Sequence, residues 1–113
     1  MLPKENRLSN KIDFEKVKRM GNKASGKSLM ILTLSRGDDK VSRFGIVVSK
    51  HVSKRAVDRN RVKRLLRESI MSVISKVSSG YDVVIIARQN IMSLDFSEVN
   101  NDLNNVFQKA RII

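Results

Sequence analysis

The sequence predicts a single α/β domain, built as a two-layer α+β sandwich in which a mixed four-stranded sheet packs against helices. Apolar runs of strand length occur at residues 28–35, 44–49 and 82–88. Apolar residues recur at helical spacing in three other segments, residues 10–20, 54–77 and 96–109. A weak additional strand at residues 22–26 completes the expected order αβββαβα. The length of 113 residues suits one domain with a real core.

The N-terminal part is expected to hold an arm, a short helix and two paired strands. Residues 1–9 are mostly polar and are expected to form a mobile, extended arm. The apolar residues of the first helix are Ile12, Phe14, Val17 and Met20. Gly21 follows at the point where this helix would stop. Because Arg36-Gly37-Asp38-Asp39 supplies turn residues between the runs at 28–35 and 44–49, we expect these runs to be antiparallel neighbours.

The C-terminal part has the stronger local signals. Residues 54–77 form the longest helical pattern, with an apolar stripe made of Val62, Leu65, Leu66, Ile70, Val73, Ile74 and Val77. Residues 82–88 are β-branched without alternation, which is typical of a central strand covered on both faces. Asp95 and Glu98 are spaced as a capping box at the start of the helix at 96–109.

The charge of the chain indicates an anionic partner. Its formal net charge is +12, while its apolar fraction of 41% is ordinary for a folded protein, so the charge is not a sign of disorder. Cysteine is absent, which excludes disulfides and thiolate chemistry and fits a reducing cytoplasm. No apolar run approaches the roughly 20 residues of a membrane span, and the N-terminus lacks a secretory signal. We therefore expect a soluble, cytoplasmic protein.

Residues 50–67 contain eight of the 23 Lys and Arg residues. At about 100° per residue, one arc of the helix opposite the apolar stripe carries Asn60, Lys63, Arg64 and Arg67. Arg59 and Arg61 lie on its two flanks, from which they can reach sideways. Surface helices usually balance their charges, whereas residues 54–67 hold seven bases and only Asp58 as an acid. This imbalance favours a polyanion-binding face over a merely solvated one.

The same helix carries a family resemblance. Arg59-Asn60-Arg61, followed by Lys63-Arg64 and Arg67 and preceded by Ser49-Lys50 and Ala56, resembles the signature of the protein subunit of bacterial ribonuclease P. The similarity extends to Asn6-Arg7-Leu8, Asp13-Phe14, Gly45 in FGIVVSK, the DVVIIAR strand and residues 94–107. In that family a large RNA holds the magnesium ions and cleaves precursor tRNA. The protein recognises the 5′ leader and supports the active RNA fold.

The resemblance implies two RNA-binding sites. Residues matched to the contact with the catalytic RNA are Lys54, Arg55, Arg59, Asn60, Arg61, Lys63, Arg64 and Arg67. A separate cleft for the single-stranded leader, lined by the first helix and the sheet, would be built from Phe14, Val17, Lys18, Met30, Leu32, Ser49, Lys50 and Arg88. The resemblance implies no catalytic residue and no metal ligand in the protein, with Mg²⁺ entering through the RNA. The implied partners are the catalytic RNA and precursor tRNA, without DNA or a membrane.

The resemblance also implies an unusual topology and a departure in the cleft. The strand at 44–49, the long helix and the strand at 82–88 would form a left-handed crossover, although such units are right-handed in roughly 98% of cases. Members often carry aromatic residues where this chain has Lys18 and Leu32. Base stacking would then rest on Phe14 alone, unless Phe14 is simply a core residue. The leader would be held more by charge.

Other functions are less well supported. His51, the only histidine, is expected to be a solvated loop residue, and no acid pair, nucleophile with a base or Gly-rich phosphate loop is present. A ribosomal or general RNA-binding protein is the main alternative, since it would share the charge and the fold pattern. A helix-turn-helix DNA-binding protein would be largely helical. A membrane-surface helix would need aromatic anchors, which residues 54–77 lack.

Overall fold

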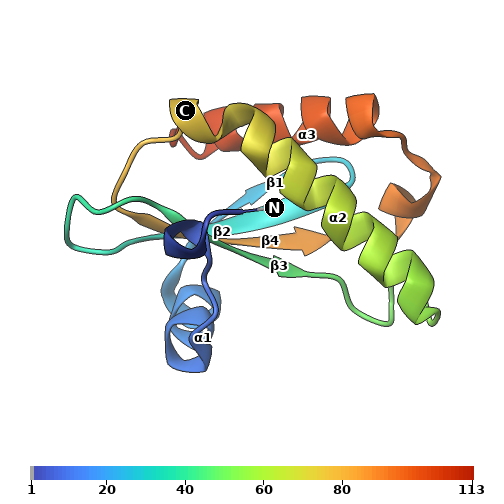
Figure 1. Cartoon of the computed structure of the whole chain (residues 1–113), viewed down its shortest axis with the longest axis horizontal. Helices are drawn as coiled ribbons and strands as arrows, with labels where there is room; N and C mark the ends of the chain where they lie inside the picture. Colours follow the sequence, from blue (N-terminus) through green and yellow to red (C-terminus); the bar gives the residue numbers. More distant parts are fainter. Residues whose placement is uncertain (1) are drawn as a thin grey trace.

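A four-stranded sheet lies between one helix on its first face and two helices on its second (Figure 1). The computed structural model describes residues 2–113. Its strands are β1 Asn22–Ser25, β2 Leu29–Ser35, β3 Arg43–Val47 and β4 Tyr81–Ala87, in the sheet order β1-β2-β4-β3. Its helices are α1 Lys11–Met20, α2 Ala56–Val73 and α3 Phe96–Lys109, with 3₁₀ turns at Lys4–Asn6, Ile74–Lys76 and Gln89–Ser93. The predicted order αβββαβα and the mixed sheet are confirmed.

Strand β4 is central, as its sequence predicts. It pairs antiparallel with β2 and parallel with β3, and its consecutive Val and Ile residues face the two layers in turn. The prediction that residues 28–35 and 44–49 are antiparallel neighbours is wrong, because β4 lies between them. A strand that is apolar on both faces gains most at the centre of a sheet, where neighbours satisfy both of its edges. The segment at β1 is a real strand, paired antiparallel with β2.

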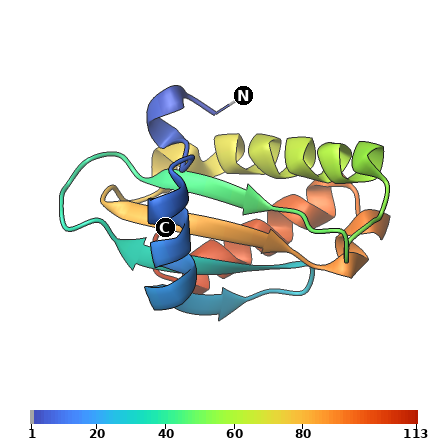
Figure 2. The same ribbon diagram turned by 90° about the horizontal axis from the view of Figure 1, so that it is seen from below.

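The β3–α2–β4 connection is left-handed. Figure 2 views the sheet from the side of α1: β3 and β4 run in the same direction, and α2 returns behind them on the far face. Following the chain from β3 through α2 to β4 traces a left-handed turn in both views. The unusual hand implied by the resemblance is therefore present. On the face opposite α1, this connection places α2 over the β3 half of the sheet and leaves the β1–β2 half to α3.

The helix boundaries follow local capping. The Asn10 side chain accepts hydrogen bonds from the backbone N–H groups of Ile12 and Asp13 and so begins α1. The capping box at the start of α3 is present as predicted. Helix α2 is shorter than the predicted 54–77. A turn in which the Ser53 hydroxyl donates to the Asp58 carboxylate, at 2.9 Å, precedes α2, and the chain tightens into a 3₁₀ turn after it.

The apolar pattern of α1 was overestimated. Phe14 and Val17 face the sheet, but Ile12 and Met20 are 78% and 55% exposed. A ten-residue helix that lies across a sheet presents only a narrow stripe to it, so the outer apolar residues remain in solvent.

The prediction of a mobile N-terminal arm is also wrong. Leu2 and Leu8 are both 4% exposed, and the backbone N–H of Leu8 donates to the carbonyl of Phe44 at 3.0 Å. Leu2 joins the main core cluster, in which the rings of Phe44 and Phe107 stack with centroids 6.1 Å apart. The two apolar side chains of an otherwise polar segment therefore anchor it to the edge of the sheet.

The apolar residues form two clusters of unequal size on the two faces of the sheet. The larger packs between the sheet, α2 and α3, and the smaller lies under α1. In the smaller cluster only Leu8, Val17 and Val84 are buried, so this face is only partly covered. Across residues 2–113, no helix combines the length and apolar character needed to span a membrane.

A buried carboxylate ties α3 to the loop between β1 and β2. The two Asp102 oxygens accept bonds from the Lys27 N–H at 3.1 Å, the Ser28 N–H at 2.7 Å and the Ser28 hydroxyl at 2.5 Å. Burial by itself would raise the pKa of Asp102, but these donors outweigh it and leave the pKa below its ordinary value. The ionised form is therefore the one that the fold stabilises.

Asp102→Asn is expected to lower the free energy of unfolding by about 1.5–3 kcal/mol at pH 7, because one amide NH₂ would face a backbone donor. The folded-state pKa is depressed, so the stabilisation is complete above the unfolded pKa of about 3.9 and is lost as the pH falls below it. Urea unfolding from pH 7 to pH 3 measures this. Asp39→Asn, in an exposed turn, is the matched control. Equal effects of the two substitutions would contradict the assignment.

Candidate nucleic-acid interface

Helix α2 exposes its basic side and buries its apolar side. Val62, Leu66 and Ile70 have no exposed area, whereas the predicted arc on the opposite side is exposed at Asn60, Arg64 and Arg67 and half-buried at Lys63. Within the described residues, no carboxylate forms an ion pair with Lys63, Arg64 or Arg67, the three cations of this arc. The arc therefore presents its positive charge outward with no internal partner.

Arg59 and Arg61 do reach sideways, as predicted, and both are held by carbonyl groups. Arg59 donates to the Ser53 carbonyl at 2.9 Å, and Arg61 donates to the Met92 carbonyl at 3.0 Å. Arg59 thus stabilises the loop before α2, and Arg61 connects α2 to the 3₁₀ turn after β4. Met92 has no sequence signal for this role, since its contribution is a backbone oxygen.

The first turn of α2 is set further along the chain than expected. A loop of six residues from Ser49 to Lys54, with a turn at residues 50–52, precedes Arg55, the N-cap of the helix. Lys50, Lys54 and Arg55 are exposed there, and Arg55 approaches Asp58 at 3.9 Å. The free N–H groups at the start of α2 are therefore separated along the chain from Ser49 and Lys50.

Helix α1 crosses the other face of the sheet along one row of residues. Gly45, Val84 and Leu32 are register partners across β3, β4 and β2. The Phe14 ring lies over Gly45, and the end of α1 at Gly21 approaches Leu32. Val17, between them, joins the cluster that contains Val84. The helix is thus close to perpendicular to the strands (Figure 2).

Beside α1 the sheet face is open. The next row on the same face contains Val47, Ile86 and Met30, all half-buried. Ser49 and Arg88, just beyond the ends of β3 and β4, are exposed. We call this region the open sheet face, defined by Met30, Val47, Ser49, Ile86 and Arg88. Val47 and Ile86 were not predicted; strand alternation from Met30 and Arg88 would have found them.

The predicted cleft residues divide between this face and its support. Val17 has no exposed area, so its prediction as a leader-contacting residue is wrong; it packs α1 onto the sheet. Leu32 lies in the row beneath α1. Lys18 is exposed and, at about 100° per residue, points to the opposite side of α1 from Asp13. Asp13 faces the flank of α1 that lies away from the open sheet face, beside Arg43. Lys18 therefore faces the open sheet face.

That far flank is closed by an ion-pair cluster. Arg43 makes two 2.8 Å bonds to Asp82 and approaches Asp13 of α1 at 3.3 Å, and Arg36 lies 4.0 Å from Asp82. The hydrogen bond to Asp82 is the main cause that raises the pKa of Arg43. The charges of Arg36 and Arg43 are therefore neutralised inside the protein. Only one flank of α1 is left for a ligand.

Acidic and histidine side chains are scattered elsewhere. In the part of the chain that the structure describes, no group of three or more His, Cys, Asp or Glu is arranged to hold a metal ion. His51 is exposed in the loop before α2, as predicted.

The comparisons with known proteins agree with this geometry. The model of the family described as Ribonuclease P matches residues 2–111. The chain belongs to the ribonuclease P protein family. The ribonuclease P protein component of Fusobacterium nucleatum is 38% identical over 96% of this chain and 99% of its own length. That of Pseudanabaena sp. is 37% identical over 100% of this chain and 97% of its own length.

Solved ribonuclease P proteins have the same fold. The Staphylococcus aureus protein aligns with a TM-score of 0.87 at 28% identity, covering 96% of this chain and 98% of that one. The Thermotoga maritima protein aligns with a TM-score of 0.81 at 29% identity, covering 91% and 96%. The chain is thus a subunit of the ribonuclease P endoribonuclease, associates with ribonuclease P RNA and serves in tRNA 5′ processing. The alternative of a ribosomal or general RNA-binding protein is not supported.

Gly45→Ala is expected to destabilise this ribonuclease P protein by about 1–3 kcal/mol, because the added Cβ would collide with the Phe14 ring and lift α1. A double-mutant cycle with Phe14→Ala measures the contact. In the Phe14→Ala background the same glycine substitution should cost less, with a coupling energy of about 0.5–3 kcal/mol. Additive costs would mean that Gly45 matters for another reason.

Proposed function

We propose that this ribonuclease P protein divides its RNA contacts between two surfaces. Helix α2 contacts the catalytic RNA, and the open sheet face beside α1 holds the 5′ leader of precursor tRNA. The observation that carries the proposal is the set of cations without internal partners on both surfaces, set apart from the neutralised Arg36 and Arg43. We further propose that the protein works in the cytoplasm on precursor tRNA and does not act on DNA or membranes.

The chemistry of α2 supports contact with a structured RNA. Arg64 and Arg67 are exposed one turn apart, and each guanidinium presents planar paired donors that match phosphate oxygens. Asn60, on the same arc, can donate to and accept from a base edge or a 2′-hydroxyl. The helix is rigid because its opposite side is packed in the core. Fixed spacing of cations suits a folded RNA better than a flexible tail would.

The chemistry of the open sheet face supports contact with a single strand. Half-buried Met30, Val47 and Ile86 offer a flat apolar floor, while Lys18 and Arg88 can hold phosphates at its borders. The part of Phe14 that is exposed adds the aromatic surface at the β3 edge. Because stacking residues are few, charge contributes a large share of leader binding.

The protein supplies no active site in this proposal. Cleavage chemistry and the Mg²⁺ ions belong to the RNA, and the protein binds, orients and screens charge. Its cations reduce the repulsion between the catalytic RNA and the precursor tRNA, which are both polyanions. Without the protein, a higher concentration of magnesium is needed to screen this repulsion.

Reconstitution at low magnesium tests the proposal. Adding the protein to ribonuclease P RNA is expected to raise the rate of precursor-tRNA cleavage, because protein cations replace part of the magnesium requirement. The readout is release of the 5′ leader on a denaturing gel. Protein alone should leave the substrate intact; cleavage by highly purified protein would refute an RNA-borne active site.

Lys18→Gln tests the leader surface. Loss of this charge beside the open sheet face is expected to lower the preference for precursor over mature tRNA by about fivefold, the effect of roughly 1 kcal/mol. Binding of both tRNAs to the reconstituted enzyme gives the ratio. Lys16→Gln removes the same charge from the opposite side of α1 and is the control. An equal loss for both tRNAs with Lys18→Gln would place the leader elsewhere.

A further inference from the structure

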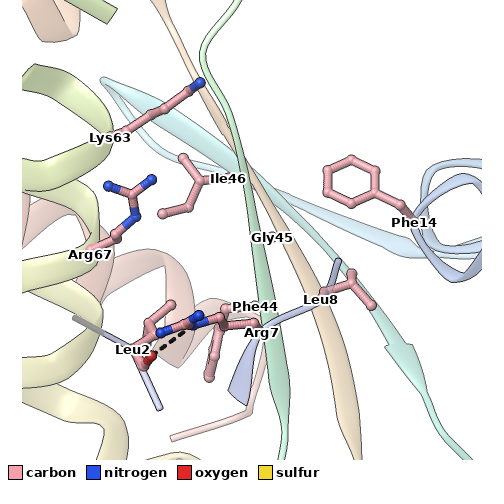
Figure 3. Close-up of a pocket in the computed structure, with 9 residues that line it drawn as sticks. All are labelled: Leu2, Arg7, Leu8, Phe14, Phe44, Gly45, Ile46, Lys63 and Arg67. Carbon is pink, nitrogen blue, oxygen red and sulfur yellow. Dashed lines mark hydrogen bonds between the residues drawn. The ribbon is translucent and has the colours of Figure 1, made fainter. Parts of the chain in front are cut away.

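A hollow of about 380 Å³ opens at the outer edge of β3 (Figure 3). Arg7 from the N-terminal segment and Lys63 and Arg67 from α2 form its polar wall. Figure 3 shows these two α2 cations on one side of β3 and Phe14 on the other, with Gly45 on the strand between them. The volume lies in the range of roughly 300–1,000 Å³ typical of small-ligand pockets. A hollow of this size suits a single nucleotide better than a flat surface would.

The three cations of the hollow have no acidic partner. The ion pairs of residues 2–113 involve Arg36, Arg43 and Arg55 as the bases, and no carboxylate lines the hollow. Arg7 donates its Nε–H to the Leu2 carbonyl at 2.9 Å, which fixes the side chain while its charge stays uncompensated. Like charges brought together from two elements repel each other, and an anion between them removes that cost.

The strand edge adds hydrogen-bonding groups to the hollow. The Phe44 carbonyl accepts from the Leu8 N–H, so Phe44 points its backbone groups outward from the sheet. Since successive residues of a strand point to alternate edges, the N–H and C=O of Ile46 face the same way. In the described chain, no hydrogen bond continues this pairing beyond Leu8. One donor and one acceptor are thus presented beside the cations.

We propose that the hollow binds a single unpaired nucleotide of RNA. Its phosphate lies among Arg7, Lys63 and Arg67, and its base lies along the β3 edge, against the Ile46 backbone groups and the Phe14 ring. The proposal rests on the RNA-binding function proposed above and adds a third contact to it. A strand seated here crosses the sheet edge and connects the α2 surface with the open sheet face. Gly45 keeps this crossing low, because a Cβ would displace the Phe14 ring.

Adenosine 5′-monophosphate, adenosine and inorganic phosphate are the probes for the full-length protein, followed by ¹⁵N-edited NMR. The monophosphate is expected to shift the amides of Gly45 and Ile46 and the Nε–H of Arg7. It should bind more tightly than either fragment, since only it contacts both ends of the hollow. Phosphate binding equal to that of the nucleotide would overturn the proposal, as would shifts confined to residues outside the hollow.

Arg7→Gln and Lys4→Gln form a matched pair of variants. Each removes one charge from the N-terminal segment, but Lys4 does not line the hollow. Arg7→Gln is expected to weaken binding of the monophosphate about tenfold, the effect of one charge-assisted hydrogen bond, and Lys4→Gln less than twofold. Arg67→Gln serves the same purpose if Arg7→Gln alters the fold. Equal losses for Arg7→Gln and Lys4→Gln would mean that the overall positive charge of the protein, and not a specific site, attracts the nucleotide. This result would overturn the proposal.

The same protein samples, assayed with ribonuclease P RNA at low magnesium, separate this proposal from the one on which it rests. Activation of the RNA together with equal losses in the two variants removes only the nucleotide site. Loss of activation together with specific nucleotide binding removes only the proposed division of RNA contacts. Preferential binding of an acidic peptide, which would extend the sheet at β3, would also overturn the nucleotide assignment.

Discussion

Strand β4 is the constraint on which the rest of the fold depends. Its run of Val and Ile is apolar on both faces, so it must be covered from above and below and paired on both edges. Residues of one face meet α2 and α3, and those of the other meet α1. Covering this strand therefore requires helices on both faces of the sheet. The two surfaces proposed to bind RNA lie on opposite sides of the sheet, because the Val and Ile run of this strand must be covered on both faces.

The basic side of α2 is tolerated because packing outweighs repulsion. Like charges three or four residues apart destabilise a helix by roughly 0.2–0.5 kcal/mol per pair, and residues 59–67 contain about four such pairs. Burial of each large apolar side chain contributes about 1.5–3 kcal/mol, and Val62, Leu66 and Ile70 are fully buried. Packing of the apolar side therefore outweighs the repulsion among these cations. This repulsion is relieved on binding, which adds to the affinity for a polyanion.

The sequence predicted those parts of the fold whose signals are local. The capping box of α3 and the β-branched run of β4 each lie within a few residues, and both were placed correctly. The pairing of β2 and β3 was not, because sheet order depends on contacts between residues far apart in the chain. The prediction of a mobile N-terminal arm was also wrong. Leu2 and Leu8 are isolated apolar residues in the sequence, and they become buried only because the edge of β3 lies beside them.

For the candidate site, the sequence likewise predicts where the cations lie but not which of them are neutralised by acids. The sequence identifies the cations of α2 correctly as outward-facing, since helical periodicity places them opposite the apolar stripe. It does not separate Arg43, which is neutralised by Asp82 and Asp13, from Arg7, which lies at the same edge without an acid. Both are single arginines in polar surroundings. Only the register of β3 with β4, which brings Arg43 opposite Asp82, makes the distinction. The net charge of +12 therefore overstates the field available to RNA, and the strand pairing decides where that field is left uncompensated.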